Sequence, residues 1–210
     1  MKTDDLIAAL AADNTPRPTP GARMAQALPV ALLLSLVALV LLWRVRPDLA
    51  AALGSAAAVK TIVPVLLTLV ALWLARGMTR PEARARAQWA LVAVMVLAGG
   101  LALAQGIATQ GFAGLIGALD TPNLITCLVS IPVLSALPLA ASFWAMKSGA
   151  PANPRLAGVA AGLLAGAGGT AIYSLHCPED SLLFCLPAYG GTMLIVVAAG
   201  ALLGPRLLRW

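Results

Sequence analysis

Six long apolar runs separated by short polar segments dominate the pattern of this chain. Each run holds about 20 residues, enough for a helix to cross roughly 30 Å of hydrocarbon. Because a bilayer offers the backbone no hydrogen-bond partners, helices are the expected spanning elements. The pattern predicts six spanning helices at about residues 25–43, 56–75, 87–107, 123–146, 156–175 and 183–203.

The first 23 residues are polar and precede the first run. They begin with a short helical pattern, acidic in its first turn and apolar on one face, formed by Asp4, Asp5, Leu6, Ile7 and Leu10. A frayed tail, a helix on the lipid surface and a helix that binds a partner's groove all fit this pattern. Three prolines in residues 14–21 predict an extended spacer between this helix and the membrane.

Composition places the chain in the membrane class. Of its 210 residues, 60% are hydrophobic and 10% are charged, which is too little polar surface to cover a soluble core. We therefore expect an all-α integral membrane protein, with residues 1–23 as N-terminal helix and spacer and residues 24–210 as a six-helix transmembrane bundle. The first run is followed by Trp43 and Arg44 rather than by a small-residue cleavage site, so a signal peptide is not expected.

The basic residues predict the orientation of the bundle. Six spans place both termini on one side, and that side carries eleven basic residues: Lys2, Arg17, Arg23, Arg76, Arg80, Arg84, Arg86, Lys147, Arg155, Arg206 and Arg209. The other side has three, Arg44, Arg46 and Lys60, with Asp48 as a partial offset. The positive-inside rule therefore predicts cytoplasmic termini. It also accounts for the net charge of +6 without a nucleic-acid partner.

This orientation gathers the chain's thiols at the outer side. Cys127 falls near the outer end of the fourth span, Cys177 in the loop between the fifth and sixth, and Cys185 at the start of the sixth. Segments 108–121 and 176–182 are the expected outer loops, and the second also carries His176, Glu179 and Asp180. A disulfide is allowed in that oxidising compartment.

Three interpretations of these cysteines stay open. Cys127 and Cys177 suit a disulfide, or with His176 they suit a soft divalent metal, with Glu179 or Cys185 as a fourth ligand. The chain has no CxxC or HxxxH motif, so the spacing is weak evidence for metal. Alternatively, the cysteines pack as small apolar residues among helices.

Small residues and prolines within the spans bear on helix packing. Glycines at four-residue spacing favour close helix approach, either within one bundle or between two copies, and they are Gly158, Gly162, Gly166, Gly200 and Gly204. Prolines inside the second and fourth spans predict kinks, at Pro64, Pro132 and Pro138.

Other classes of membrane protein find less support. No Asp or Glu lies in the middle of a span, which counts against a transporter or pump. The lack of CxxC counts against a thiol-redox or quinone-linked enzyme. No Ser-His-Asp set or carboxylate pair is assembled in the loops, so we expect no enzyme, with those two classes as the alternatives.

The segment HCPEDS at residues 176–181, the Leu-Leu-Phe that follows it, the closing GALLGPRLLRW and the opening MKTDDLIAALAAD resemble the NrsF-type membrane anti-sigma factors over essentially the whole chain. The resemblance implies a bacterial inner-membrane protein that holds an ECF sigma factor at the cytoplasmic face and does not contact nucleic acid itself. Cys127 and Cys177 fall where that family keeps its functional pair, whereas Cys185 does not match the pattern.

The resulting hypothesis is a sensor and tether. The segment from Asp4 to Leu10, together with the loop from Arg76 to Arg86, holds the sigma factor in the resting state. Heavy-metal binding or oxidation at Cys127 and Cys177 then changes the spacing of the fourth and fifth spans and releases the partner. A tenfold drop in affinity needs only about 1.4 kcal/mol of differential binding.

Overall fold

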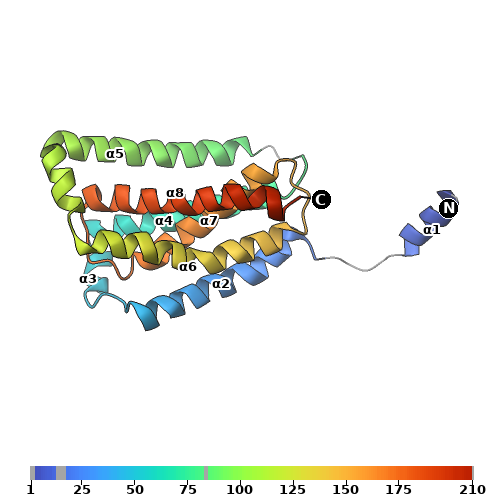
Figure 1. Ribbon diagram of the computed structural model, residues 1–210, viewed down its shortest axis with the longest axis horizontal. Helices are drawn as coiled ribbons and strands as arrows, with labels where there is room; N and C mark the ends of the chain where they lie inside the picture. The colour runs from blue at the N-terminus through green and yellow to red at the C-terminus, as the bar shows by residue number, and fades with distance from the viewer. Residues whose placement is uncertain (1–2, 13–17, 83–84, 210) are drawn as a thin grey trace.

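The computed structural model describes residues 3–12, 18–82 and 85–209, and these residues form helices without any strand (Figure 1). Six of the helices are long and apolar enough to cross a membrane, which confirms the predicted number. The elements are α1 (Thr3–Ala12), α2 (Pro20–Leu42), α3 (Leu49–Leu53), a 3-10 turn (Ala56–Ala58), α4 (Val59–Met78), α5 (Arg86–Leu119), α6 (Pro122–Met146), α7 (Pro154–Tyr173) and α8 (Leu182–Leu207).

The first long helix begins earlier than predicted. Thr19 caps α2, because its hydroxyl oxygen accepts a hydrogen bond from the amide of Ala22 at 3.2 Å. Pro20 then occupies the first turn, where its missing amide donor costs nothing. The helical bundle therefore starts at Pro20 and not at residue 24. The predicted spacer overlaps residues 13–17, which lie outside the described ranges.

The third long helix departs most from the expected pattern. α5 continues to Leu119, so the predicted loop at residues 108–121 is wrong for most of its length. Gly111 interrupts the helix with φ 73° and ψ 172°, a conformation that favours glycine because it lacks a Cβ. The chain bends there and resumes as helix, as the green end of α5 shows in Figure 1.

α7 is the central helix of the bundle and packs against α4, α6 and α8. About 78% of the residues in the apolar stretch of α7 are buried, whereas none of those in the apolar stretch of α5 are. Its many alanines and glycines let three neighbours approach closely at once. A helix rich in alanine and glycine thus takes the middle, and the helix whose apolar stretch is least buried lies at the edge.

The spaced glycines are used inside this chain. A Cβ placed on Gly162 of α7 would lie 2.7 Å from the Cα of Val197 and 2.8 Å from the carbonyl oxygen of Val196, both on α8. Gly158 of α7 faces Gly200 and Gly204 of α8 in the same way. Since all these glycines are buried between the two helices, the faces proposed for a homodimer are already occupied.

A proline in α6 creates a link to α2. Pro138 has no amide hydrogen, so the carbonyl of Leu134 one turn earlier loses its helical partner. The hydroxyl of Ser35 on α2 donates to that carbonyl at 2.8 Å. The bond is buried and satisfies a polar group that apolar surroundings would otherwise leave unpaired.

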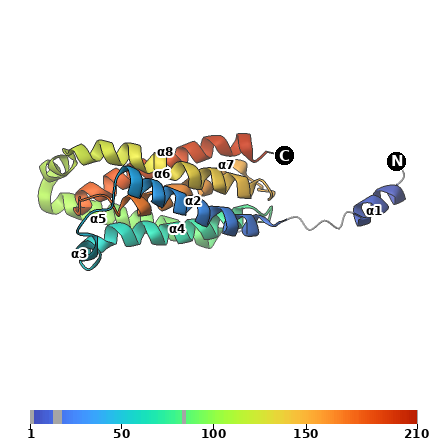
Figure 2. The ribbon, with the colours of Figure 1, turned by 90° about the horizontal axis from the view of Figure 1, so that it is seen from below.

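The two ends of the bundle differ in what they carry. The start of α2 and the end of α8 lie at one end, which we call the termini end, and Figures 1 and 2 show α1 beyond it, apart from the bundle. The bend of α5, the short α3 and the 174–181 loop lie at the opposite end, which we call the loop end.

Candidate functional site

All three cysteines lie at the loop end. Cys127 comes from the second turn of α6, Cys177 from the 174–181 loop and Cys185 from the first turn of α8. Their exposed fractions are 0%, 0% and 3%, and all are free thiols. The prediction that the cysteines gather at one end is therefore confirmed, because the starts of α6 and α8 and the 174–181 loop all lie at the loop end.

Cys127 and Cys177 lie in one buried cluster. The neighbouring Cys127 thiol lowers the pKa of the Cys177 thiol below its ordinary value. Burial opposes the lowering, while the hydroxyl of Tyr189 and the charge of Lys60 add to it. A thiol in this setting has more thiolate character than a cysteine buried in a purely apolar core.

Two tyrosines enclose the sulfur pair. Tyr173 at the end of α7 and Tyr189 on α8 pack edge to face, with ring centroids 6.1 Å apart. Both are buried in the same cluster as Cys127 and Cys177. The pair is therefore shielded from the surroundings on the side of the bundle core.

Lys60 fastens the loop that carries Cys177. Its ammonium nitrogen donates to the carbonyl oxygen of Cys177 at 2.6 Å and to that of Glu179 at 2.7 Å. It also lies 2.7 Å from a carboxylate oxygen of Asp180. The residue is 6% exposed, which is unusual for lysine and is offset by these three partners.

Arg46 grips the same loop from the turn after α2. Its guanidinium donates to the carboxylates of Asp48 and Asp180 at 2.7 Å each, and to the carbonyl of Cys177 at 3.3 Å. Its backbone amide donates to the carbonyl of Leu175 at 3.0 Å. The loop is thus held by two cations from two different elements.

The charges of this cluster shift one another's titration. Hydrogen bonds from Arg46, with help from Lys60, lower the pKa of Asp180 to about 2. The hydrogen bond from Arg46 also lowers the pKa of Asp48, and both carboxylates raise the pKa of Arg46. All three groups therefore keep their charges throughout the neutral range.

His176 and Glu179 do not join the sulfur pair. The Nδ1 atom of His176 lies 2.9 Å from the carbonyl oxygen of Arg44, and the carboxylate of Glu179 accepts from the amide of Asn123 at 2.8 Å. Cys185 donates to the carbonyl of Glu179 at 3.4 Å. Among the described residues, no group of three or more His, Cys, Asp or Glu side chains could hold a metal ion. The predicted metal set of Cys127, Cys177 and His176 is therefore not assembled.

Sequence reasoning missed the residues that hold the site. In the sequence, Lys60 and Arg46 counted only as basic residues on the side opposite the termini, which carries fewer of them. Their discordance with the positive-inside rule was the available signal, because a basic residue retained there needs another role. Nothing in the spacing pointed to Tyr173 or Tyr189.

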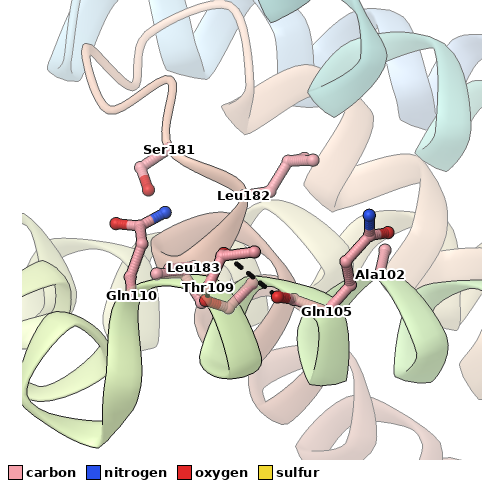
Figure 3. Close-up of a pocket in the computed structure, with 8 residues that line it drawn as sticks. Ala102, Gln105, Thr109, Gln110, Ser181, Leu182 and Leu183 are labelled. Carbon is pink, nitrogen blue, oxygen red and sulfur yellow. Dashed lines mark hydrogen bonds between the residues drawn. The ribbon is translucent and has the colours of Figure 1, made fainter.

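A hollow of about 260 Å³ with a mixed polar and apolar lining lies beside the loop, between α5 and the start of α8 (Figure 3). Gln105, Thr109 and Gln110 of α5 line it, and the side chain of Gln110 points toward Ser181. The hydroxyl of Thr109 donates to the carbonyls of Gln105 and Gly106 at 3.1 and 3.0 Å. The 174–181 loop therefore contacts the buried Lys60 and Arg46, and its last residue, Ser181, lines this hollow.

Comparison with known proteins assigns the family. Residues 10–210 match the NrsF family, described as negative regulator of sigma F. The chain belongs to the NrsF family. It is 36% identical to the anti-sigma-F factor NrsF of Caulobacter vibrioides, over 100% of both chains. It is also 47% identical to the probable anti-sigma-F factor NrsF of Azospira oryzae, over 41% of this chain and 38% of the relative. No solved structure matches the chain.

Membership in the NrsF family confirms the resemblance seen in the sequence. The family consists of anti-sigma factors, which are regulatory proteins rather than enzymes, and it implies a sigma factor as partner. The prediction that the protein is not an enzyme agrees with this assignment.

The predicted partner-binding residues lie on α1, at the termini end. Asp4, Asp5, Leu6 and Ile7 are exposed, with 43% of Leu6 and 60% of Ile7 accessible. Leu10 belongs to the helix, but its side chain lies outside the described part of the chain. Thus α1 presents apolar and acidic side chains together at its surface.

Proposed function

We propose that this NrsF-family protein spans the bacterial inner membrane through its six long helices, with both termini in the cytoplasm. The length and apolarity of the helices support insertion. Eleven basic residues toward the termini side against three on the other support the orientation. Two of those three, Arg46 and Lys60, are buried among carbonyls and carboxylates, so the discordant charges have partners within the protein.

The partner in this proposal is a sigma factor of the ECF class, held at the cytoplasmic face. The family assignment supports the sigma factor. The exposed Leu6 and Ile7 of α1, next to Asp4 and Asp5, offer an apolar and acidic surface for it. Sigma factors bind DNA and carry basic surface, which an acidic helix complements.

The signal in this proposal is oxidation of Cys127 and Cys177. The observation that carries it is a pair of free, fully buried thiols in one cluster, one on α6 and one just after α7. Each thiol gives up its hydrogen as the S–S bond forms, and the two protons and two electrons reduce one hydrogen peroxide, with cleavage of its O–O bond, to two molecules of water. No other co-reactant is needed.

Bond formation links the trigger to the bundle. The two free sulfurs must approach to a covalent length of about 2.05 Å, with the restricted dihedral of a disulfide. This draws the start of α6 toward the loop that follows α7, because Cys127 lies on α6 and Cys177 lies four residues after the end of α7. A bundle that packs differently in the oxidised state then binds the sigma factor less tightly.

A release assay tests this proposal. The full-length protein is reconstituted in nanodiscs with its sigma factor, and free sigma factor is measured after hydrogen peroxide or Cd²⁺. We expect peroxide to release the partner from the wild type, and Cys127→Ser and Cys177→Ser to bind normally but release nothing. Cys185→Ala is the matched control and should respond like the wild type.

The assay also separates the two triggers. Release by Cd²⁺ without disulfide formation would replace oxidation by a two-sulfur metal complex as the signal. If both serine variants still release the sigma factor normally, the cysteines only pack and the proposal fails.

A further inference from the structure

The most unusual feature that the proposed function leaves unexplained is a pair of buried cations at the loop end. Lys60 is 6% exposed and Arg46 is 8% exposed, although both are long and charged. Such side chains are almost never buried unless they are paired. Apart from Asp48, the partners of both side chains belong to a single segment, the 174–181 loop.

Both cations reach the peptide of Cys177 itself. Lys60 arrives from the start of α4 and Arg46 from the turn after α2, and each donates to the Cys177 carbonyl oxygen, at 2.6 and 3.3 Å. A peptide held from two directions has little freedom to rotate. The orientation of that peptide decides where the Cys177 side chain points.

We infer that Lys60 and Arg46 are positioning residues for the thiol pair, because their grip on the Cys177 peptide keeps its sulfur beside that of Cys127. This inference rests on the proposed role of the pair in sensing. Both cations donate to oxygen atoms rather than to a reacting sulfur, so each acts through the backbone that it holds.

Asp180 pairs with both cations. One of its carboxylate oxygens lies 2.7 Å from both cations, so it bridges them and offsets their mutual repulsion. Asp48 pairs with Arg46 from the outer side. A clamp of two cations and two carboxylates is electrically neutral, which suits the end of an apolar bundle.

The clamp also favours one pairing among the three cysteines. Cys185 donates to the carbonyl of Glu179, which Lys60 holds as well, so its sulfur is committed to the loop backbone. Cys177 and Cys127 pack in the same buried cluster. Holding two reactive groups at the right distance raises the rate of their reaction greatly, and a displacement of about 1 Å can cost about 100-fold.

The rate of disulfide formation tests the inference directly. The full chain in nanodiscs is treated with hydrogen peroxide, and the Cys127–Cys177 linked peptide is followed by mass spectrometry. Lys60→Met and Arg46→Met keep side-chain volume but remove the donors to the Cys177 carbonyl. We expect each to slow formation of this disulfide by about tenfold or more, and to raise the share of disulfides that involve Cys185.

Three matched variants separate positioning from other effects. Arg44→Met removes an equal charge from the same turn, but its side chain is exposed, so it should change nothing. Leu67→Ala destabilises α4 through a core contact away from the loop and should lower thermal stability without slowing the disulfide. Lys60→Arg restores a cationic donor at the position and should recover most of the rate.

The outcome is decisive either way. Wild-type rates in Lys60→Met and Arg46→Met would overturn the inference, as would equal slowing in Leu67→Ala at matched stability. If Lys60→Met does not fold, Asp180→Asn keeps both cations and loosens the clamp, and it must then slow the disulfide. The assay contains no sigma factor, so it can succeed or fail independently of the release experiment.

Discussion

Replacing Gly162 by alanine is the sharpest test of how the bundle is built. In the structure a Cβ at this position meets the Cα of Val197 at 2.7 Å and the carbonyl oxygen of Val196 at 2.8 Å. Ordinary contacts of a Cβ begin near 3.4 Å. Both obstacles are backbone atoms, so no rotamer change can relieve the clash and α7 must move away from α8.

The cost follows from overpacking of a close interface. Adding a methyl group to a well-packed core typically costs about 1–3 kcal/mol, and α7 is the helix that the other spans surround. Gly191→Ala is the matched control, since that glycine lies on α8 with nothing within 4 Å of its Cβ. Thermal or denaturant unfolding in detergent micelles measures the difference between the two variants.

Two results would refute this reasoning. Equal stability of Gly162→Ala and Gly191→Ala would mean that the helices do not approach as closely as described. A loss of dimer mass in light scattering, with unchanged monomer stability, would instead assign the glycines to contact between two copies. We expect lower stability and an unchanged mass.

Two further predictions concern the ends of the bundle. Leu6→Asp on α1 should weaken sigma-factor binding by about tenfold or more, because burying one leucine is worth about 1.5–3 kcal/mol. Ala8→Asp on the other face of that helix is the charge-matched control, and equal losses in a pull-down would exclude the apolar face as the contact. At the loop end, the pKa of Asp180 is lowered to about 2, so its stabilising contribution should be complete above about pH 4 and lost as the pH falls through 2. Unfolding measured from pH 7 to 2 should show a smaller acid-side loss in Asp180→Asn, and identical profiles would contradict the ion pairs.

The local sequence predicts much of this architecture. Six apolar runs of spanning length give six helices because each backbone must satisfy its hydrogen bonds within its own segment. The alternation of direction then brings Cys127 and Cys177 to one end, whatever the helices pack against. The segment HCPEDS and the two chain ends were enough to predict the NrsF family, which the comparisons confirm.

Other features depend on which helices meet, and periodicity carries no such information. The glycine spacing of α7 fits a neighbour in the same chain or in another copy equally well, and only the packed bundle shows α8 in that place. In the sequence, Gly111 falls within a predicted loop, although in the structure the helix resumes beyond it. These choices depend on contacts between distant residues.

The clamp on the Cys177 peptide is the clearest case of what only tertiary structure decided. Lys60 and Arg46 lie more than a hundred residues before the loop that they hold. In the sequence these two and Arg44 are the three basic residues on the side opposite the termini. Their burial depends on carbonyls of the 174–181 loop and on Asp180 arriving from the other half of the chain. A buried charge is tolerated only where folding supplies its partners, and the sequence does not show which residues will meet.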